Sequence, residues 1–188
     1  MKYFKKLVGE KIYLSPINIE DVEKYTEWIN DFHTTDYTGR SSNLYTIEGE
    51  QKCLEKIVNS ETDRIFAIID LNGDKLIGNC GIHKVDFINR TAVLGIFIGD
   101  KEGRNRGAGT EAIKLLLDFG FNYLNLHSIS LDLMEFNERA LACYKKCGFK
   151  ECGRRRESKF INGKYYDSIR MDILEKEFEG SYIKNKNI

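Results

Sequence analysis

The sequence predicts a single α/β domain of 188 residues, in which flanking helices cover a mixed central sheet of six to seven strands. Short runs rich in Val, Leu, Ile and Phe alternate with longer segments whose apolar residues recur at helical spacing. Three strand segments follow one another without an intervening helix, which indicates antiparallel pairing. A further strand follows a helix, which indicates a parallel neighbour.

The N-terminal third is expected to hold one short strand and two helices. The strand covers 11–14 and ends before Pro16, the only proline of the chain. The first helix covers 20–30 and carries acidic residues in its first turn, which suits the positive end of a helix dipole. A polar loop over 31–43 and a second amphipathic helix over 46–59 follow. This helix–loop–helix segment is either a lid over a substrate or simple packing on the sheet.

The middle of the chain is expected to form three consecutive antiparallel strands over 64–70, 75–85 and 92–98. An Asn-Gly pair supplies the hairpin turn between the first two. After a long helix, segment 128–134 alternates apolar and polar residues. Because a helix connects it to 92–98, these two strands are expected to be parallel neighbours.

The C-terminal part is expected to contain one helix and one hairpin. The helix covers 137–147 and is ended by a glycine, and the hairpin joins 149–160 to 164–173 across a second Asn-Gly pair. Residues 1–10 and 175–188 are expected to be peripheral tails.

Composition excludes several classes of function. Charged residues make up 31% of the chain, yet the formal net charge is zero, so nothing recruits nucleic acid or an anionic membrane. No apolar run approaches transmembrane length, and the N-terminus lacks a signal-peptide core. The five cysteines form no paired framework, so reduced thiols in the cytoplasm are expected. Cys143, Cys147 and Cys152 lack metal-ligand spacing, and no metal site is expected.

The segment 92–117 organises the functional prediction. Its strand leads into a loop dense in Gly and Arg, and a helix begins near Thr110. Free backbone N–H groups and the positive end of the helix dipole meet at that loop. Glycines let a ligand approach the backbone, and Arg104 and Arg106 add positive charge. The segment therefore predicts a phosphate-binding site.

Three ligand loops and one simpler explanation compete for this segment. A Walker loop is excluded because no Lys precedes Thr110. The dinucleotide fingerprint matches 107–112, with Asp132 as its acidic partner, but about three antiparallel strands precede the loop. A tight turn that only needs glycines stays open on the loop alone. The third ligand loop is R-x-x-G-x-G over 104–109, which resembles the acetyl-CoA loop of the GNAT superfamily of N-acetyltransferases.

A second segment strengthens this resemblance. The pattern N-x-x-A-x-x-x-Y-x-x-x-G-F over 137–149 is similar to the second acetyl-CoA segment of that superfamily. It stands one helix and one strand after the loop, as in the family. The ending F-I-N-G-K-Y-Y-D with Arg170-Met171 looks like the branch of ribosomal-protein N-terminal and spermidine acetyltransferases, although a hairpin turn also explains its Asn-Gly pair.

The resemblance implies acetyl-CoA as the cofactor. The loop would hold the pyrophosphate, and Asn137 would bind the cofactor arm. Lys146 would contact the nucleotide phosphates, or it would only be part of a solvated helix face. The two parallel strands would part beyond 96–98, and pantetheine amides would bind the exposed backbone there like an added strand. The residues implied are Ile96, Phe97, Ile98, Arg104, Asn105, Arg106, Gly107, Ala108, Gly109, Thr110, Asn137 and Lys146.

The resemblance also implies the acid and the oxyanion donor. Tyr144 would donate a proton to the leaving thiolate, whereas its alternative role is packing. A backbone N–H near Ile98 would stabilise the oxyanion. No cysteine stands in a nucleophile motif, so direct transfer without an acetyl-enzyme is expected.

The base is less clearly marked. Many relatives carry Glu in a pattern A-E-x-G, and here that position is Val93. Asp132 and Glu135, near the end of the next strand, are the substitutes, and Asp132 matches by position a carboxylate of some protein N-terminal acetyltransferases. Surface carboxylates at a strand end explain both equally well. His83 and His127 are further candidates without a supporting motif.

The function expected is transfer of acetyl from acetyl-CoA to a primary amine. A protein N-terminus, a polyamine and another small amine such as an amino sugar stay open as acceptors. Acidic residues of the first helix suit a polycation, whereas Arg154-Arg155-Arg156 would oppose one if they lined the cleft. The alternatives are a non-catalytic acyl-CoA sensor and a dinucleotide-binding protein. Nucleic acid and membrane partners are not expected, and a homodimer is compatible with the family.

Overall fold

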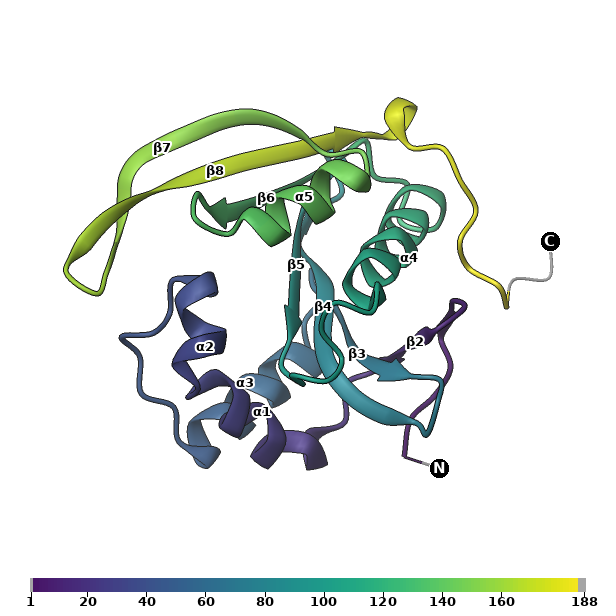
Figure 1. Ribbon diagram of the computed structural model, residues 1–188. Helices are drawn as coiled ribbons and strands as arrows, with labels where there is room; N and C mark the ends of the chain where they lie inside the picture. Colours follow the sequence, from purple (N-terminus) through teal and green to yellow (C-terminus); the bar gives the residue numbers. More distant parts are fainter. Residues whose placement is uncertain (1, 186–188) are drawn as a thin grey trace.

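A computed structural model describes residues 2–185 of the chain (Figure 1). Its strands form one mixed sheet in the order β1-β2-β3-β4-β5-β6-β8-β7. The strands are β1 Leu7–Val8, β2 Ile12–Pro16, β3 Arg64–Asp70, β4 Lys75–Asp86, β5 Thr91–Ile98, β6 Ser128–Met134, β7 Lys150–Ile161 and β8 Lys164–Leu174. The predicted mixed sheet is confirmed with eight strands. The additional strand β1 has two residues, too few for a periodic pattern in sequence.

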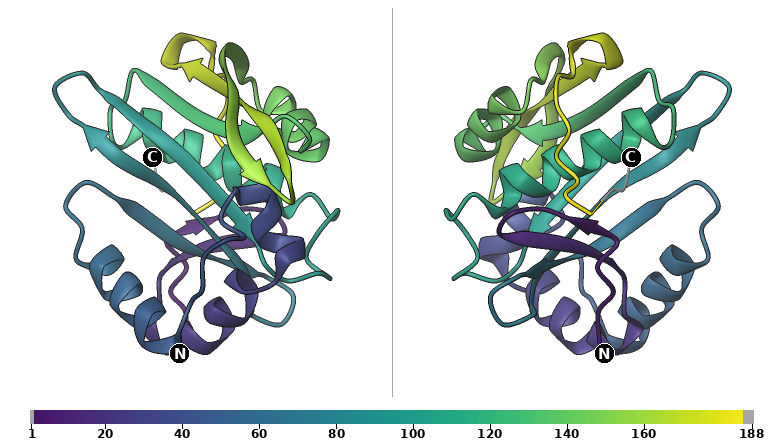
Figure 2. Two further views of the ribbon diagram at one scale, coloured as in Figure 1. Left: turned by 90° about the vertical axis from the view of Figure 1, so that its left-hand side faces the viewer. Right: turned by 90° about the vertical axis from the view of Figure 1, so that its right-hand side faces the viewer.

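The helices lie in two layers. They are α1 Val22–Ile29, α2 Phe32–Thr35, α3 Ile47–Val58, α4 Ala108–Asn122 and α5 Glu138–Lys146, with short 3₁₀ turns η1 Ile19–Asp21, η2 Asp36–Thr38 and η3 Glu175–Glu177. α4 and α5 cover one face of the sheet, and α1 and α3 cover the other (Figures 1 and 2). No helix within residues 2–185 is long and apolar enough to cross a membrane.

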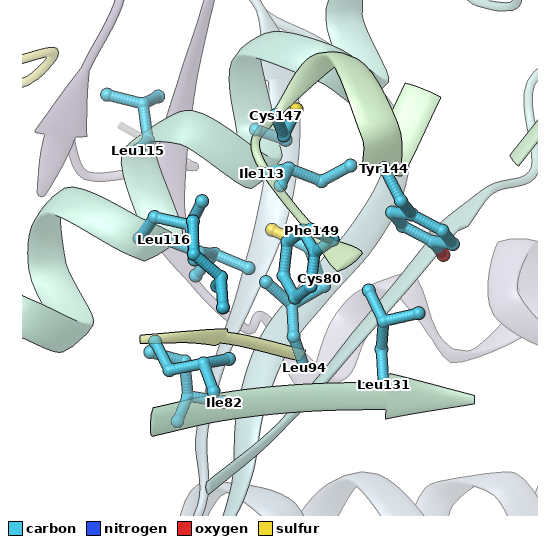
Figure 3. Packing of buried hydrophobic residues seen from close by; sticks show 14 of the residues in the cluster. Cys80, Ile82, Leu94, Ile113, Leu115, Leu116, Leu131, Tyr144, Cys147 and Phe149 are labelled. Carbon is cyan, nitrogen blue, oxygen red and sulfur yellow. The ribbon is translucent and has the colours of Figure 1, made fainter. Parts of the chain in front are cut away.

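Each face of the sheet has its own apolar core. Under α4 and α5, Ile82, Leu94 and Leu131 pack with Ile113 and Leu116 (Figure 3). The smaller core under α1 and α3 consists of Tyr3, Tyr13, Tyr25, Trp28, Leu54, Ala67, Ile69 and Leu76. Side chains that alternate along β4 and β5 therefore belong to different compartments.

The predicted order of strands is confirmed in the centre of the sheet. β3, β4 and β5 are antiparallel neighbours, and β5 lies parallel to β6. Parallel pairing runs only from Thr91–Ser128 to Val93–Ser130. The expectation that the two strands part beyond 96–98 is wrong, because they already part after Val93. From there β5 stays paired with β4, and β6 pairs with β8 up to Met134.

The polar segment expected to be a loop over 31–43 contains α2 and η2. The Asp31 side chain accepts a hydrogen bond from the His33 backbone N–H at 3.0 Å and caps α2. Thr34 and Thr35 are buried beneath this turn. A four-residue helix is too short to leave a periodic pattern, so a polar composition alone predicted a loop.

The terminal segments differ from the peripheral tails expected at 1–10 and 175–188. Tyr3 and Leu7 are buried, and so is Ile183. The fully buried carboxylate of Asp118 on α4 accepts hydrogen bonds from the backbone N–H groups of Tyr182 and Ile183. A buried carboxylate needs such donors, and this need holds the segment 182–183 against α4. The end of that expected tail, 186–188, lies outside the described residues.

Candidate active site

The loop before α4 has the geometry of an anion-binding nest. Gly107 caps the helix with a φ of 87°, and Asn105 also has a positive φ of 63°. The first helical hydrogen bond runs from Glu111 N–H to Gly107 O at 3.0 Å. Within the described part of the chain, the backbone N–H groups of 105–110 donate to no protein acceptor. Consecutive free N–H groups at a helix N-terminus bind phosphate oxygens.

A lysine that carries no sequence motif joins this loop. The Lys11 ammonium donates to Arg106 O at 3.2 Å, and it would lie 3.5 Å from a methyl group at Gly107. The Glu111 carboxylate accepts from the backbone N–H groups of Glu10 and Lys11 and is thereby turned toward the β1–β2 turn. Positive charge therefore flanks the nest, while its nearest carboxylate is engaged elsewhere. Only the three-dimensional pairing of β2 with the rest of the sheet brings Lys11 to this position.

β5 has one open edge beside this loop. Gly99 N–H donates to Ile77 O at 3.0 Å, which fixes the alternation of the antiparallel ladder with β4. By that alternation, the backbone polar groups of Leu94, Ile96 and Ile98 point away from β4. β6 no longer pairs with β5 there. The backbone of Leu94 and Ile96 thus lies on an open edge, while the Ile98 carbonyl accepts from Arg104 Nε.

Arg104 and Phe97 are placed differently from the prediction. Arg104 Nε donates to Ile98 O at 3.1 Å, and its Nη2 donates to Thr34 Oγ1 at 3.0 Å. The guanidinium thus links the end of β5 to α2 instead of lying among phosphates. The Phe97 ring packs edge-on against Trp28 with 5.9 Å between centroids, on the face of α1. Alternation along β5 places this ring in the other core, so it does not line the open edge.

Tyr144 extends from α5 toward the place where β5 and β6 part. Its side chain is 8% exposed, and its hydroxyl end lies on the side of Leu131 (Figure 3). Within the described part of the chain, the hydroxyl has no hydrogen-bond partner. Burial raises the pKa of the phenol well above its usual value, so the proton stays on oxygen at neutral pH. A protonated hydroxyl without a partner can donate to an incoming acceptor.

Two cysteines of α5 contact the first turn of α4. Cys143 Sγ lies 3.2 Å from Thr110 Oγ1, and Cys147 Sγ lies 3.8 Å from Thr110 O. Hydrogen bonding with Cys147 and Thr110 lowers the pKa of the Cys143 thiol, although burial opposes this change. Thr110 is thus tied to α5, beside the predicted pyrophosphate loop. No cluster of three or more metal-ligating side chains occurs within residues 2–185.

The two carboxylates predicted as bases are both engaged in ion pairs. Glu135 Oε1 accepts from the Asp167 backbone N–H at 2.8 Å, and its Oε2 lies 3.2 Å from Arg154 Nη1. Both oxygens therefore hold the β7–β8 hairpin. Asp132 Oδ2 lies 3.6 Å from Arg170 Nη1, and its side chain is 37% exposed.

Asn137 and Lys146 lie at opposite ends of α5. The Asn137 side-chain oxygen accepts from the Ala140 backbone N–H at 3.2 Å, so it acts as the N-cap of the helix. The cap engages the side-chain oxygen and leaves the amide nitrogen for a ligand. Lys146 is exposed in the last turn.

The sheet face opposite α4 and α5 carries a further group of titratable side chains. His83 of β4 belongs to this face because its neighbour Ile82 belongs to the other core. Glu50 lies one turn before the buried Leu54 on α3 and is itself 9% exposed. Its carboxylate has no hydrogen bond or ion pair within the described residues. Burial raises the pKa of Glu50, and Arg40 opposes that rise.

The far end of this face is aromatic. Phe136, which follows β6, packs against Tyr37 of η2 and Tyr166 of β8, with centroid distances of 5.9 and 4.7 Å. The β7–β8 hairpin projects past β6 to the side where α2 lies (Figures 1 and 2). A methyl group at Gly39 would lie 3.5 Å from Lys159 Cδ of that hairpin. The segment around α2 and η2 thus lies between the hairpin and the open edge of β5.

The profile of the acetyltransferase (GNAT) domain matches residues 11–150, about three quarters of the chain. The chain belongs to the GNAT acetyltransferase family. It is an N-acetyltransferase that uses acetyl-CoA, and the mixed sheet, the nest before α4 and the open edge of β5 fit this assignment.

Individual GNAT relatives refine this comparison. The chain is 29% identical over 180 residues to YjcK of Bacillus subtilis, described as a probable N-acetyltransferase, covering 92% of this chain and 99% of that one. It is 34% identical over 128 residues to the spermidine N(1)-acetyltransferase of Vibrio cholerae, covering 68% and 73%. The crystal structure of spermidine N-acetyltransferase from Vibrio cholerae, in complex with CoA and spermine, superposes with a TM-score of 0.81 at 28% identity. It covers 89% of this chain and 97% of that one.

Proposed function

We propose that this GNAT protein transfers acetyl from acetyl-CoA to a primary amine of a polyamine, directly and without an acetyl-enzyme. The observation that carries the polyamine assignment is the buried carboxylate of Glu50, which has no ion pair within residues 2–185 and lies on the face opposite the cofactor helices. Similarity to proteins named for spermidine supports the same acceptor class. Protein N-termini and amino sugars are the competing acceptors.

The cofactor fits the chain's own residues. The free N–H groups of 105–110 would bind the pyrophosphate, with Lys11 and Arg106 beside it. The backbone of Leu94 and Ile96 and the N–H of Ile98 would pair with the pantetheine amides as an added strand. Bound there, acetyl-CoA supplies the thioester as acyl donor. Because its arm runs back from the loop along β5, the thioester would lie toward Val93, where the strands meet.

Two groups would act on the reacting atoms. A backbone N–H on the open edge of β5 is the proposed oxyanion donor. The Tyr144 hydroxyl would donate to the departing sulfur, because it is protonated and has no competing partner. Its raised pKa makes full proton transfer less favourable, so hydrogen bonding to the thiolate carries much of its effect.

Glu50 would bind a cationic nitrogen of the acceptor. Burial of an unpaired carboxylate is unfavourable, and an ammonium group would relieve that penalty by ion pairing. A polyamine has several amines, so one can be held as a cation while another reacts. An acceptor with one amine cannot do both.

A panel of acceptors tests the proposal. Release of CoA thiol is measured at saturating acetyl-CoA with spermidine, spermine, peptides with free N-termini and an amino sugar, and products are identified by mass spectrometry. We expect kcat/KM to be highest for the polyamines. Faster acetylation of a peptide N-terminus or of the amino sugar would contradict the polyamine assignment while keeping the enzyme class.

A further inference from the structure

The resemblance drawn from the sequence implies a Glu in a pattern A-E-x-G on β5, and this chain has none there. The pattern A-E-x-G becomes Ala92-Val93-Leu94-Gly95 here, so the position beside the acceptor is apolar. A primary amine with a pKa near 10.4 still has to lose its protons to water or to a protein group. Another side chain must therefore accept a proton at this place if the protein assists the step.

His83 stands directly opposite the missing carboxylate. In the antiparallel register of β4 and β5, His83 pairs with Val93, and β6 continues the same row through the pair Val93–Ser130. Directly opposite residues of a ladder project from the same face, with Cβ atoms about 5 Å apart. His83 therefore reaches the region that a carboxylate at Val93 would occupy.

The imidazole leans along β5 toward the open edge. A methyl group at Gly95 would lie 3.0 Å from His83 Nε2 and 3.3 Å from its Cδ2. Gly95 is two residues beyond the last pair of β5 with β6. His83 Nε2 thus lies beside the part of β5 that has separated from β6, on the face of the sheet opposite Tyr144. The absence of a side chain at Gly95 leaves room for this position.

Asp63 lies on the other side of the ring. Its Oδ1 lies 3.9 Å from His83 Nδ1 and accepts the Lys84 backbone N–H at 2.8 Å, while its Oδ2 accepts from the Ser60 hydroxyl at 3.1 Å. A fixed carboxylate near Nδ1 favours a proton on that nitrogen and leaves Nε2 with its lone pair. This is the order of groups that a general base requires.

Burial favours the neutral form of His83. Burial lowers the pKa of the imidazole below its usual value, Asp63 raises it, and Arg40 and Lys84 lower it further, with a net decrease. The side chain is nevertheless 40% exposed, so an accepted proton has a path to solvent. A neutral, partly solvated imidazole can accept and release a proton in each turnover.

We propose that His83 is the general base of acetyl transfer, in place of the missing carboxylate, and that Asp63 is its positioning residue. The proposal rests on the amine acceptor of the proposed function. The amine enters as its neutral form, having lost one proton to water. Its lone pair forms the C–N bond at the thioester carbonyl, a proton passes from that nitrogen to His83 Nε2 directly or through one water, and the C–S bond breaks. Tyr144 stabilises or protonates the sulfur, and His83 returns its proton to solvent.

The test combines kinetics with a readout that needs no cofactor. In wild-type protein, we consider the plot of log kcat/KM for spermidine against pH. Its slope should be one above the pKa of His83 and two below it, because amine and imidazole must both be deprotonated. We expect His83→Ala to lose about 10²-fold in kcat at pH 7 and to keep slope one. Added imidazole should restore part of the rate, and CoA affinity should stay unchanged. NMR titration of His83 without cofactor should give a midpoint below 6.5.

Matched variants separate a base from a structural residue. His127→Ala removes an exposed histidine elsewhere and should leave the rate unchanged. Asp63→Asn removes a negative charge that favours the protonated imidazole. It should therefore move both the NMR titration midpoint of His83 and the slope-two region of the kcat/KM profile to lower pH. If His83→Ala melts early, His83→Asn replaces it with the same expected profile.

Three outcomes would overturn the role of His83. They are a His83→Ala variant with more than half of the wild-type kcat, no rescue by imidazole, and a larger loss in Asp132→Asn than in His83→Ala. Absence of turnover by the wild type with every amine would instead contradict the proposed function. The NMR midpoint and its shift in Asp63→Asn would still test the placement of the imidazole.

Discussion

The cofactor side and the acceptor side of this protein are assembled from the sequence in different ways. The cofactor side comes from the continuous stretch from β5 through the loop into α4, together with α5. The acceptor side gathers His83 from β4, Glu50 from α3 and Asp63 from the residue before β3, and no local pattern connects them. A helix N-terminus is formed by residues adjacent in sequence, whereas the acceptor face forms only when the strands pair in the correct register.

The difference predicts that the two sides respond separately to mutation. Substitutions in the nest should change CoA affinity, and substitutions on the acceptor face should change amine kinetics. The hydrogen bond from Arg104 Nη2 to Thr34 Oγ1 is one of the contacts that join them. Four variants test this separation, from the largest expected effect to the smallest.

Gly107→Val should have the largest effect. Valine strains the backbone at φ 87° and places bulk where phosphate oxygens should bind, so we expect CoA affinity to fall at least about 100-fold, or ~2.7 kcal/mol. Calorimetric titration with CoA measures it. Gly73→Val, at φ 94° in an open turn, imposes similar strain away from the site and serves as the control. Equal CoA affinity in folded Gly107→Val and wild type would disprove the loop assignment.

Tyr144→Phe should follow with a loss of about 10²-fold in kcat and in kcat/KM. The ring and its packing against Phe149 stay, and only the hydroxyl is lost. Steady-state thiol release at saturating acetyl-CoA measures the loss, with the exposed Tyr123→Phe as control. A kcat above half of the wild-type value, where chemistry limits the rate, would make Tyr144 a packing residue.

The same contrast explains what sequence reasoning could and could not predict. The order and type of the main strands and helices are encoded in local periodicity, and the nest in adjacent glycines. Sequence reasoning did not predict placements that depend on strand register. These are the separation of β5 and β6 after Val93, the orientation of Arg104 toward Thr34, and the position of Lys11 beside the nest. The ion pair of Glu135 with Arg154 likewise depends on how the β7–β8 hairpin returns.

Glu50→Gln should raise KM for spermidine about tenfold, or ~1.4 kcal/mol, with kcat nearly unchanged. The substitution keeps shape and removes the charge that would bind an ammonium group. Glu48→Gln makes the same change at an exposed position of α3 and serves as control. Without amine, Glu50→Gln should melt no earlier than wild type, because an unpaired buried carboxylate is lost. A raised CoA dissociation constant in Glu50→Gln would contradict the separation of the two sides.

Thr34→Val should have the smallest effect, about threefold in kcat/KM. It removes the one oxygen of α2 that accepts from Arg104, a partly buried hydrogen bond to a charged group, while the bonds of Arg104 to the end of β5 stay. Thr35→Val, whose hydroxyl bonds within its own turn, is the control. A loss as large as that of Tyr144→Phe would show that the two sides work as one unit.

Intact-mass analysis of the protein incubated with acetyl-CoA tests the central claim of direct transfer most directly. Cys143 is the residue to watch, because hydrogen bonding with Cys147 and Thr110 lowers the pKa of its thiol and α5 holds it beside the cofactor loop. We predict an unmodified protein without amine and, after spermidine is added, one acetylated polyamine for each CoA thiol released. An acetyl group on Cys143 that forms and disappears as fast as kcat would contradict direct transfer.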